Sequence, residues 1–268
     1  MGKGLFVVRY SFMEVSIETE SDHPVRNGKV LVVGVGGLGC PAALTLARAG
    51  VGTVGLIDPD VVELSNLQRQ ILHATPDIGR PKVDSAREKL LRVNPTITII
   101  PYFQRLSVAT LPVLFRDYDF IIDGTDGVAT KFLINDGAVL LRKPFSYAGI
   151  VQFHGQTLTV LPRISTCLRC LFPDPPSGDE IPTCQESGII GSLAGSVGIL
   201  QAAEAIKYLR GTGKLLTDRL LTYDALALRW REVQVRRNRH CPLCGEHPTI
   251  TDLEPVMQEH ANPCTLGT

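Results

Sequence analysis

The sequence predicts an α/β fold: a Rossmann-like, mostly parallel sheet with helices on both faces and a C-terminal antiparallel extension clipped by a zinc site of four cysteines. Three observations support this prediction. In the first half, strand patterns alternate with helical patterns of roughly 10–15 residues, which implies right-handed crossovers and a parallel sheet. The second half contains short strands separated by turns. Four of the seven cysteines form two CxxC pairs, which is the spacing of a zinc site.

The strands and helices of the first half alternate in order. Strands are predicted at 29–34, 52–60, 96–103, 119–126 and 145–150. Helices are predicted at 40–50, 81–95 and 128–142. Gly50 closes the first helix, as glycine commonly does. The second helix has a single apolar stripe, formed by Val83, Ala86, Leu90 and Val93.

The second half of the sequence predicts a different arrangement of strands and helices. Residues 151–161 predict antiparallel strands with a glycine turn, and the apolar stretch 188–206 predicts a buried helix. Two further strands are expected at 219–225 and 228–237. No linker rich in proline, glycine and serine divides the chain. We therefore expect an irregular N-terminal arm over 1–28, a single domain over 29–248 and a flexible tail over 249–268.

The composition narrows the classes of partner. The 268 residues are enough for one large domain with a substantial core. Lysine plus arginine equals aspartate plus glutamate at 27 each, so we expect neither a nucleic-acid partner nor a membrane partner. No apolar run reaches the ~18 residues that span a bilayer, and we expect no signal peptide. A cytoplasmic protein with metal-binding or catalytic cysteines is expected, rather than one with disulfides.

A glycine-rich turn follows the first strand. Gly34 suits a tight turn out of the strand, Gly36 allows the backbone to approach a phosphate, and Gly39 allows close helix packing. Gly37 is a further residue of the loop without a side chain. The helix that follows presents amide donors and a partial positive charge. Asp58 ends the second strand, where an acid can bind ribose hydroxyls.

This loop alone leaves open an NAD-dependent oxidoreductase. Two cations after the ribose acid, Arg69 and Lys82, favour a triphosphate instead. Asp126 follows a central strand and could hold Mg²⁺ beside the phosphates. Asp123 could contribute to the same ion less directly, or it could cap the following helix. Asp60 is a second acid near the ribose position, and we expect it to be solvated.

The cysteines fall into two groups. Two CxxC pairs supply four thiolates for a structural, tetrahedral zinc ion: Cys167, Cys170, Cys241 and Cys244. This site would clip the C-terminal strand to the body of the protein. Cys184 stands apart in a polar loop before the long apolar helix. It is either an ordinary loop cysteine or a nucleophile with an accessible thiol.

Several motifs occur together and in order. They are VGVGGLGCPAALTLARAGVGTVGLIDPDVVELSNLQRQILH, GRPKVDSAREKL, DGTDG, CLRC, TCQESG with the following GSLAGSVG and QAAEAIK, and CPLCG. From about residue 29 to 247 the chain closely resembles the MoeB/ThiF/HesA family, the bacterial relatives of ubiquitin-activating enzymes. The resemblance implies an adenylyltransferase. ATP would adenylate the C-terminal glycine carboxylate of a ubiquitin-like sulfur-carrier protein, MoaD-like or ThiS-like and ending in Gly-Gly. Pyrophosphate would leave, and the carrier would later become a thiocarboxylate.

The resemblance also assigns roles to residues. The nucleotide-binding set comprises Gly34, Gly36, Gly37, Gly39, Asp58, Ser65, Asn66, Gln68, Arg69, Lys82, Thr125 and Asp126. Arg69 and Lys82 would act catalytically on the phosphates, Asp126 would bind Mg²⁺, and Cys184 would form a covalent sulfur or acyl link in some members. The four paired cysteines match the zinc ligands of the family. A homodimer and a sulfur donor such as a cysteine desulfurase or rhodanese are implied as partners.

Two positions depart from the family pattern. Members usually begin with an RYxRQ-like stretch whose second arginine reaches the partner subunit's ATP site, and here Phe12 stands in its place. Gly127 replaces the asparagine that usually follows the Mg²⁺ aspartate. These departures leave open a non-catalytic relative that binds a carrier. The stretch after Cys244 is similar to members that continue into a rhodanese domain, which we do not expect within these 268 residues.

Overall fold

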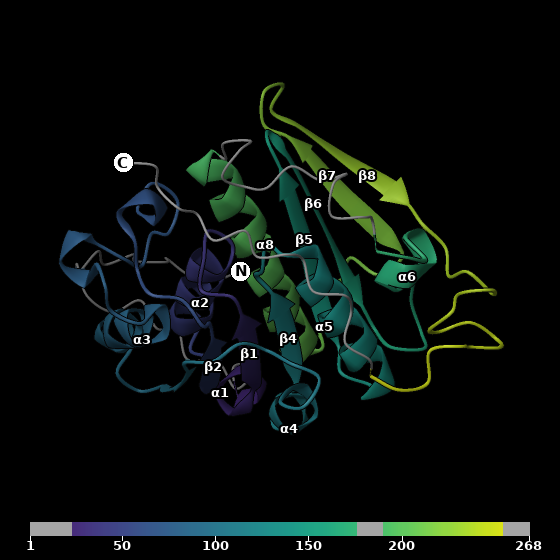
Figure 1. The fold of residues 1–268 in the computed structure, drawn as a ribbon, viewed down its shortest axis with the longest axis horizontal. Coiled ribbons are helices and arrows are strands. Elements are labelled where there is room, and N and C mark those ends of the chain that lie inside the picture. The colour runs from purple at the N-terminus through teal and green to yellow at the C-terminus, as the bar shows by residue number, and fades with distance from the viewer. Residues whose placement is uncertain (1–22, 176–189, 254–268) are drawn as a thin grey trace, which may run out of the picture.

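A single mixed sheet forms the centre of the molecule, which a computed structural model describes over residues 23–175 and 190–253 (Figure 1). In these residues the strands follow the order β3-β2-β1-β4-β5-β6-β7-β8. They are β1 (Lys29–Val33), β2 (Thr53–Ile57), β3 (Thr98–Tyr102), β4 (Phe120–Asp123), β5 (Phe145–Val151), β6 (His154–Val160), β7 (Arg219–Asp224) and β8 (Arg229–Gln234). Neighbours from β3 to β5 pair in parallel, and β6, β7 and β8 extend the sheet through antiparallel pairs. The predicted parallel sheet with an antiparallel extension is confirmed.

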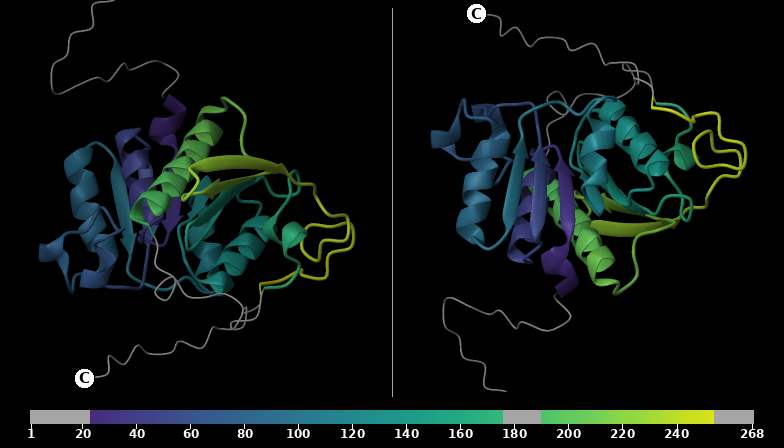
Figure 2. Two further views of the ribbon diagram at one scale, coloured as in Figure 1. Left: turned by 90° about the horizontal axis from the view of Figure 1, so that it is seen from above. Right: turned by 90° about the horizontal axis from the view of Figure 1, so that it is seen from below.

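Helices cover both faces of this sheet, as predicted (Figure 2). The α-helices in the described residues are α1 (His23–Asn27), α2 (Gly39–Arg48), α3 (Lys82–Val93), α4 (Leu111–Arg116), α5 (Val128–Leu140), α6 (Leu168–Leu171) and α8 (Gly191–Arg210). One face packs against α2, α3 and α8, and the other packs against α4, α5 and α6. The sequence did not predict α1, which lies inside the arm expected to be irregular, because one turn of helix is too short to show an apolar stripe.

The central strands are buried on both faces, which explains their continuous apolar sequence. In β1, Val30 and Val32 belong to the core under α2, α3 and α8. Leu31 and Val33 belong to the core on the opposite face. Side chains alternate between the faces of a strand. A strand covered by helices on both sides therefore needs apolar residues at every position.

The apolar stripe of α3 ends before the helix does. Val83, Ala86 and Leu90 are fully buried, as predicted. Val93, the fourth residue of the predicted stripe, is 42% exposed. Val93 is the last helical residue, and the chain turns away at Asn94, whose backbone is extended.

The hairpin between β5 and β6 turns at a different place from the one the sequence suggested. Gln152 and Phe153 form the turn, and Gln152 adopts a left-handed φ of 52°. Gly155, expected in the turn, lies within β6. A Cβ atom at Gly155 would lie 2.9 Å from side-chain atoms of both Leu193 and Val197. This glycine therefore allows α8 to approach the sheet closely.

Buried hydrogen bonds fix α8 to the sheet. The Nε2 atom of Gln201 donates to the carbonyl oxygens of Asp123, at 2.8 Å, and Ser146, at 3.0 Å. The carboxylate of Glu204 accepts a 2.6 Å hydrogen bond from the hydroxyl of Thr159. Eight of the 20 residues of α8 are buried, so the predicted buried helix is buried on one face. None of the helices in the described residues combines the length and the apolar character needed to cross a membrane.

Candidate active site

Three loops meet at the carboxyl edge of the parallel strands. β1 pairs with β2 on one side and β4 on the other, so Val33, Ile57 and Asp123 lie at one level of the sheet. The strand order reverses between β1 and β4, which is where α/β sheets bind ligands. A cavity of about 750 Å³ lies there. The predicted nucleotide-binding residues that line it are Gly34, Gly36, Gly37, Asp58, Asn66, Arg69, Lys82, Thr125 and Asp126.

In the glycine loop, residues 34–39, backbone atoms without side chains line the cavity. Gly34 has a φ of 87°, and a Cβ atom there would lie 2.8 Å from the carbonyl oxygen of Gly124. A Cβ atom at Gly39 would lie 1.8 Å from the carbonyl oxygen of Gly34, so α2 can begin only with glycine at this place. The N–H groups of Gly36 and Gly37 have no acceptor among the described residues. These two N–H groups can therefore donate hydrogen bonds to an anion.

Asp58 is a buried acceptor beside this loop. It is 5% exposed. Its Oδ2 atom accepts a 2.7 Å hydrogen bond from the N–H of Val35, and Oδ1 accepts a 2.9 Å bond from the N–H of Asp60. Burial raises the pKa of Asp58, against the opposing effects of Lys82 and of these two backbone donors. Further donors, such as ribose hydroxyls, would relieve this cost of burial.

Two predicted cations line the cavity. Lys82 is the first residue of α3 and is 6% exposed. Its ammonium group lies 2.8 Å from a carboxylate oxygen of Asp60. Asp60, which we expected to be solvated, is thus exposed but paired. Arg69 donates a 3.2 Å hydrogen bond to the carbonyl oxygen of Ser65. A third cation, Arg105, also lines the cavity and carries no motif that would reveal it.

The two aspartates of the DGTDG segment have different environments. Asp126 is exposed and lines the cavity, so its carboxylate is available to a cation. Asp123 is fully buried and accepts hydrogen bonds from the N–H and hydroxyl of Thr125, at 3.1 and 2.7 Å. The N-cap of α5 is Gly127, without a side-chain cap. The suggestion that Asp123 caps this helix is therefore wrong.

Lys131 is a buried cation that the sequence analysis missed. Its Nζ atom lies 3.2 Å from a carboxylate oxygen of Asp123. It also donates to the carbonyl oxygens of Thr125, at 2.7 Å, and Ala148, at 2.6 Å. Lys131 therefore ties α5 and β5 to the loop that carries Asp126. The available signal was that Lys131 is the single basic residue of α5.

Two buried amides face the cavity with unused acceptors. Asn66 and Gln70 are 6% and 3% exposed. The Oδ1 atom of Asn66 and the Oε1 atom of Gln70 have no hydrogen-bond partner in the described residues. A buried, unpaired acceptor is costly, so such atoms commonly await a ligand. Gln70 was not among the predicted residues, although it lies four residues after Asn66, at helical spacing.

Three predicted nucleotide-binding residues do not line the cavity. Gly39 lies behind the loop, where it packs on Gly34. Ser65 and Gln68 are exposed on the segment that carries Arg69. Their contacts with a nucleotide stay predictions. The predicted roles of Phe12 and Cys184 concern positions outside the described residues.

Four cysteines form a cluster at the far end of the sheet, as predicted. Their sulfur atoms all lie within 4.8 Å of one another. The Sγ atom of Cys167 lies 3.8 Å from Cys170, 3.7 Å from Cys241 and 3.5 Å from Cys244. None of the four is in a disulfide. A tetrahedral zinc ion with Zn–S bonds of ~2.3 Å requires sulfur separations of about 3.8 Å, so this donor set fits zinc.

Buried polar contacts hold the first cysteine pair in place. Arg169 lies between Cys167 and Cys170 in the sequence. Its guanidinium makes a bidentate pair with the carboxylate of Asp136 in α5, at 2.8 and 2.7 Å. The side-chain oxygen of Asn135 accepts a 2.9 Å hydrogen bond from the N–H of Leu168. The cluster therefore joins α5 to the segment that follows β8.

The sequence pattern of the ThiF family matches residues 13–243. The chain belongs to the ThiF family. A sulfur carrier protein adenylyltransferase of Thermus thermophilus is 44% identical to this ThiF-family chain over 239 residues, which are 87% of this chain and 88% of that protein. The adenylyltransferase and sulfurtransferase MOCS3 of Sus scrofa is 42% identical over 251 residues. These residues are 92% of this chain but 55% of MOCS3, so the chain spans about half of that relative.

Solved structures share the ThiF-family fold. A crystal structure of E. coli MccB with MccA-N7isoASN matches with a TM-score of 0.75. The match covers 84% of this chain and 69% of that chain, at 21% sequence identity. The likeness extends over the sheet and its helices rather than over a single motif, so it independently supports the fold predicted from the sequence.

Proposed function

We propose that this chain uses ATP to adenylate the C-terminal glycine carboxylate of a ubiquitin-like sulfur-carrier protein. One observation carries the proposal: a single cavity gathers the glycine loop, Asp58, Arg69, Lys82 and Asp126. Membership of the ThiF family supports it, as does the 44% identity to an adenylyltransferase that acts on sulfur-carrier proteins. The alternative of an NAD-dependent oxidoreductase has no comparable support.

The cavity has groups that complement each part of ATP. The amides of Gly36 and Gly37 have no acceptors among the described residues and suit phosphate oxygens. Asp58 is the acceptor for ribose hydroxyls. The unpaired oxygens of Asn66 and Gln70 need donors, which the hydroxyls and the exocyclic amine of a nucleotide can supply. The donors and acceptors present therefore fit the nucleotide.

The proposed reaction is a displacement at phosphorus. A carboxylate oxygen of the carrier attacks the α-phosphorus, a new bond to phosphorus forms, and the bond to the bridging oxygen breaks. Pyrophosphate leaves with that electron pair. Lys82 and Arg69 neutralise the charge that develops on the phosphate oxygens. Asp126 would bind Mg²⁺, and the ion would neutralise further charge on the phosphates.

The partners follow from the same proposal. A persulfide on a donor such as a cysteine desulfurase or a rhodanese attacks the acyl carbon of the adenylated carrier, AMP leaves, and an acyl disulfide forms. A second thiol then attacks the donor's sulfur in that disulfide, so that a new disulfide forms on the donor and the carrier leaves as a thiocarboxylate. The thiol of Cys184 forms the covalent link, either to sulfur or to the acyl group of the carrier. The chain acts as a homodimer, and its four paired cysteines hold a structural zinc ion. Mass analysis of the C-terminus of a carrier that copurifies with this chain would identify the pathway.

Exchange of radiolabelled pyrophosphate into ATP tests the proposed activity. Exchange should occur with a carrier that ends in Gly-Gly, because label enters ATP only when pyrophosphate attacks the adenylate that the carrier has formed. The matched control is the same carrier without its last glycine, which should support no exchange. Exchange without any carrier would contradict the proposal, as would the absence of exchange with both MoaD-like and ThiS-like carriers.

A further inference from the structure

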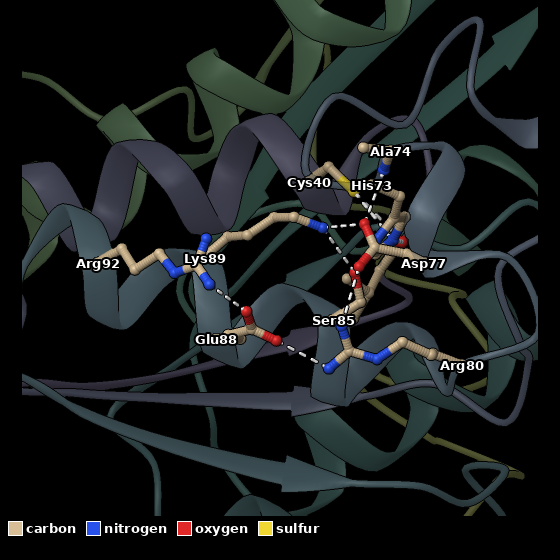
Figure 3. A network of polar contacts seen from close by, with 10 residues as sticks. Cys40, His73, Ala74, Asp77, Arg80, Ser85, Glu88, Lys89 and Arg92 are labelled. Atoms are coloured by element: carbon tan, nitrogen blue, oxygen red, sulfur yellow. Dashed lines mark hydrogen bonds and ion pairs between the residues drawn. The ribbon is translucent and has the colours of Figure 1, made fainter.

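A buried histidine joins the glycine loop to the helix that carries Lys82. His73 is 7% exposed. Its Nε2 atom lies 3.3 Å from the carbonyl oxygen of Val35, and its Nδ1 atom lies 3.0 Å from the hydroxyl oxygen of Ser85 in α3. Figure 3 shows this histidine at one side of a polar network that includes Ser85, Lys89 and Asp77.

The network fixes the tautomer of His73. Lys89 donates to the Ser85 hydroxyl oxygen at 2.9 Å. The Ser85 hydroxyl hydrogen is therefore available to donate to Nδ1, which leaves Nε2–H to donate to the carbonyl oxygen of Val35. A carbonyl oxygen can only accept a hydrogen bond, so the hydrogen lies on Nε2. Burial lowers the pKa of His73, against the opposing effect of its hydrogen bond to Val35.

This hydrogen bond sets the orientation of one peptide group in the glycine loop. The peptide between Val35 and Gly36 is planar and trans, so its N–H points away from its C=O. With the Val35 carbonyl held toward His73, the N–H of Gly36 points to the opposite side. That N–H has no acceptor among the described residues, and Gly36 lines the cavity.

The other end of the imidazole reaches the helix of the catalytic cation. Ser85 and Lys82 are three residues apart on α3, so they lie on the same side of the helix. The hydrogen bond from Ser85 to His73 therefore connects the first turn of α3 to the glycine loop. One side chain sets the spacing between a phosphate-facing amide and a phosphate-facing ammonium group.

The nearby thiol does not form a reactive pair with this histidine. The Sγ atom of Cys40 lies 3.7 Å from Nε2 of His73 and donates to the carbonyl oxygen of Val35 at 3.3 Å. Cys40 is fully buried, and burial raises the pKa of its thiol to about 12. A thiol in this state is a poor nucleophile. Cys40 is therefore a second, weaker donor to the same carbonyl.

We propose that His73 is a positioning residue for phosphate binding: by holding the Val35 carbonyl and Ser85 together, it aims the Gly36 amide and Lys82 at the same triphosphate. This inference deepens the proposed adenylation and rests on it for the identity of the ligand. It predicts that His73 strengthens binding of the phosphates of the nucleotide and does not change binding of its adenosine part.

Binding of ATP and of adenosine to His73 variants tests this role by calorimetry without any carrier. His73→Leu removes both hydrogen bonds and should weaken ATP binding about tenfold, while adenosine binding stays at the wild-type value. His73→Gln can still donate to the Val35 carbonyl and should restore most of the ATP affinity. In pyrophosphate exchange, the KM for ATP should rise in His73→Leu while the KM for the carrier stays unchanged.

A matched control separates positioning from general damage to the fold. Leu90→Ala removes a fully buried side chain from the same helix without touching the cavity. It should lower the thermal unfolding temperature and leave the ratio of ATP to adenosine affinity unchanged. Equal losses of ATP and adenosine affinity in His73→Leu would overturn the positioning role, and so would unchanged ATP affinity. Failure of the wild-type protein to bind ATP would instead overturn the proposed function.

Discussion

At the scale of single residues, buried charge in the cavity is already paired without a nucleotide. Lys82 is 6% exposed, and burying an unpaired ammonium group would be costly. Its partner Asp60 has a side chain that is 57% exposed, so solvent screens this pair. We expect the phosphate oxygens to compete with Asp60 for Lys82. The pair thus holds the ammonium group at the cavity.

Replacement of Lys82 by alanine should lower kcat for adenylation about 10²–10³-fold, because it removes a charge that stabilises the transferring phosphate. The measurement is pyrophosphate exchange with a saturating carrier, alongside thermal unfolding of each variant. Lys214→Ala is a suitable control, since Lys214 is exposed and does not line the cavity. A rate near that of the wild type in Lys82→Ala would remove Lys82 from the mechanism.

The sequence could indicate only some residues of the cavity. Gly34, Lys82 and Asp126 lie in motifs with fixed spacing, and all three line the cavity. Gln70 and Lys131 have no such motif. Their place in the site depends on burial and on contacts between distant elements, such as the 2.6 Å hydrogen bond from Lys131 to β5. Local patterns do not contain that information.

At the scale of elements, the cysteine cluster joins segments that no strand pairing connects. Cys167 and Cys170 lie at α6, whereas Cys241 and Cys244 follow β8. The bidentate pair of Arg169 and Asp136 anchors the first of these segments to α5. The antiparallel extension is therefore fixed at its end by the cluster, as well as by the hydrogen bonds between β6, β7 and β8.

Metal analysis of purified protein should find about one zinc ion per chain, because the four clustered thiolates form one complete tetrahedral site. Cys241→Ser should lose the ion and unfold at a lower temperature, since structural zinc contributes folding energy. Cys40→Ser provides the matched control. This residue lies outside the cluster, so the variant should retain its zinc. Purified wild-type protein without bound metal would contradict the assignment of a zinc site.

Long helices were easier to predict than short ones. Continuous apolar runs indicated the central strands, and the helices α2, α3, α5 and α8 have enough residues to show a helical period, so all of these were expected. The short helices α1, α4 and α6 were not, because four to six residues cannot establish a helical stripe. The misplaced hairpin turn has a related cause. Gly155 serves packing against α8, and a local pattern cannot distinguish that role from a turn.

At the scale of the whole molecule, the strand order brings the parts of the candidate active site together. The sequence predicted a parallel sheet, but it did not give the order β3-β2-β1-β4-β5. Pairing joins residues far apart in the chain, such as Val33 with Asp123. The reversal between β1 and β4 brings the glycine loop beside the segment that carries Asp126. The proposed function thus depends on both the local motifs and this arrangement.

The central claim is that the glycine loop, two cations and a strand-end carboxylate bind one triphosphate. A crystal structure with a non-hydrolysable ATP analogue and Mg²⁺ tests it most directly. The triphosphate should lie within hydrogen-bonding distance of the Gly36 amide, Arg69 and Lys82, with the ion on Asp126. An analogue bound with its phosphates away from Arg69 and Lys82 would contradict the claim.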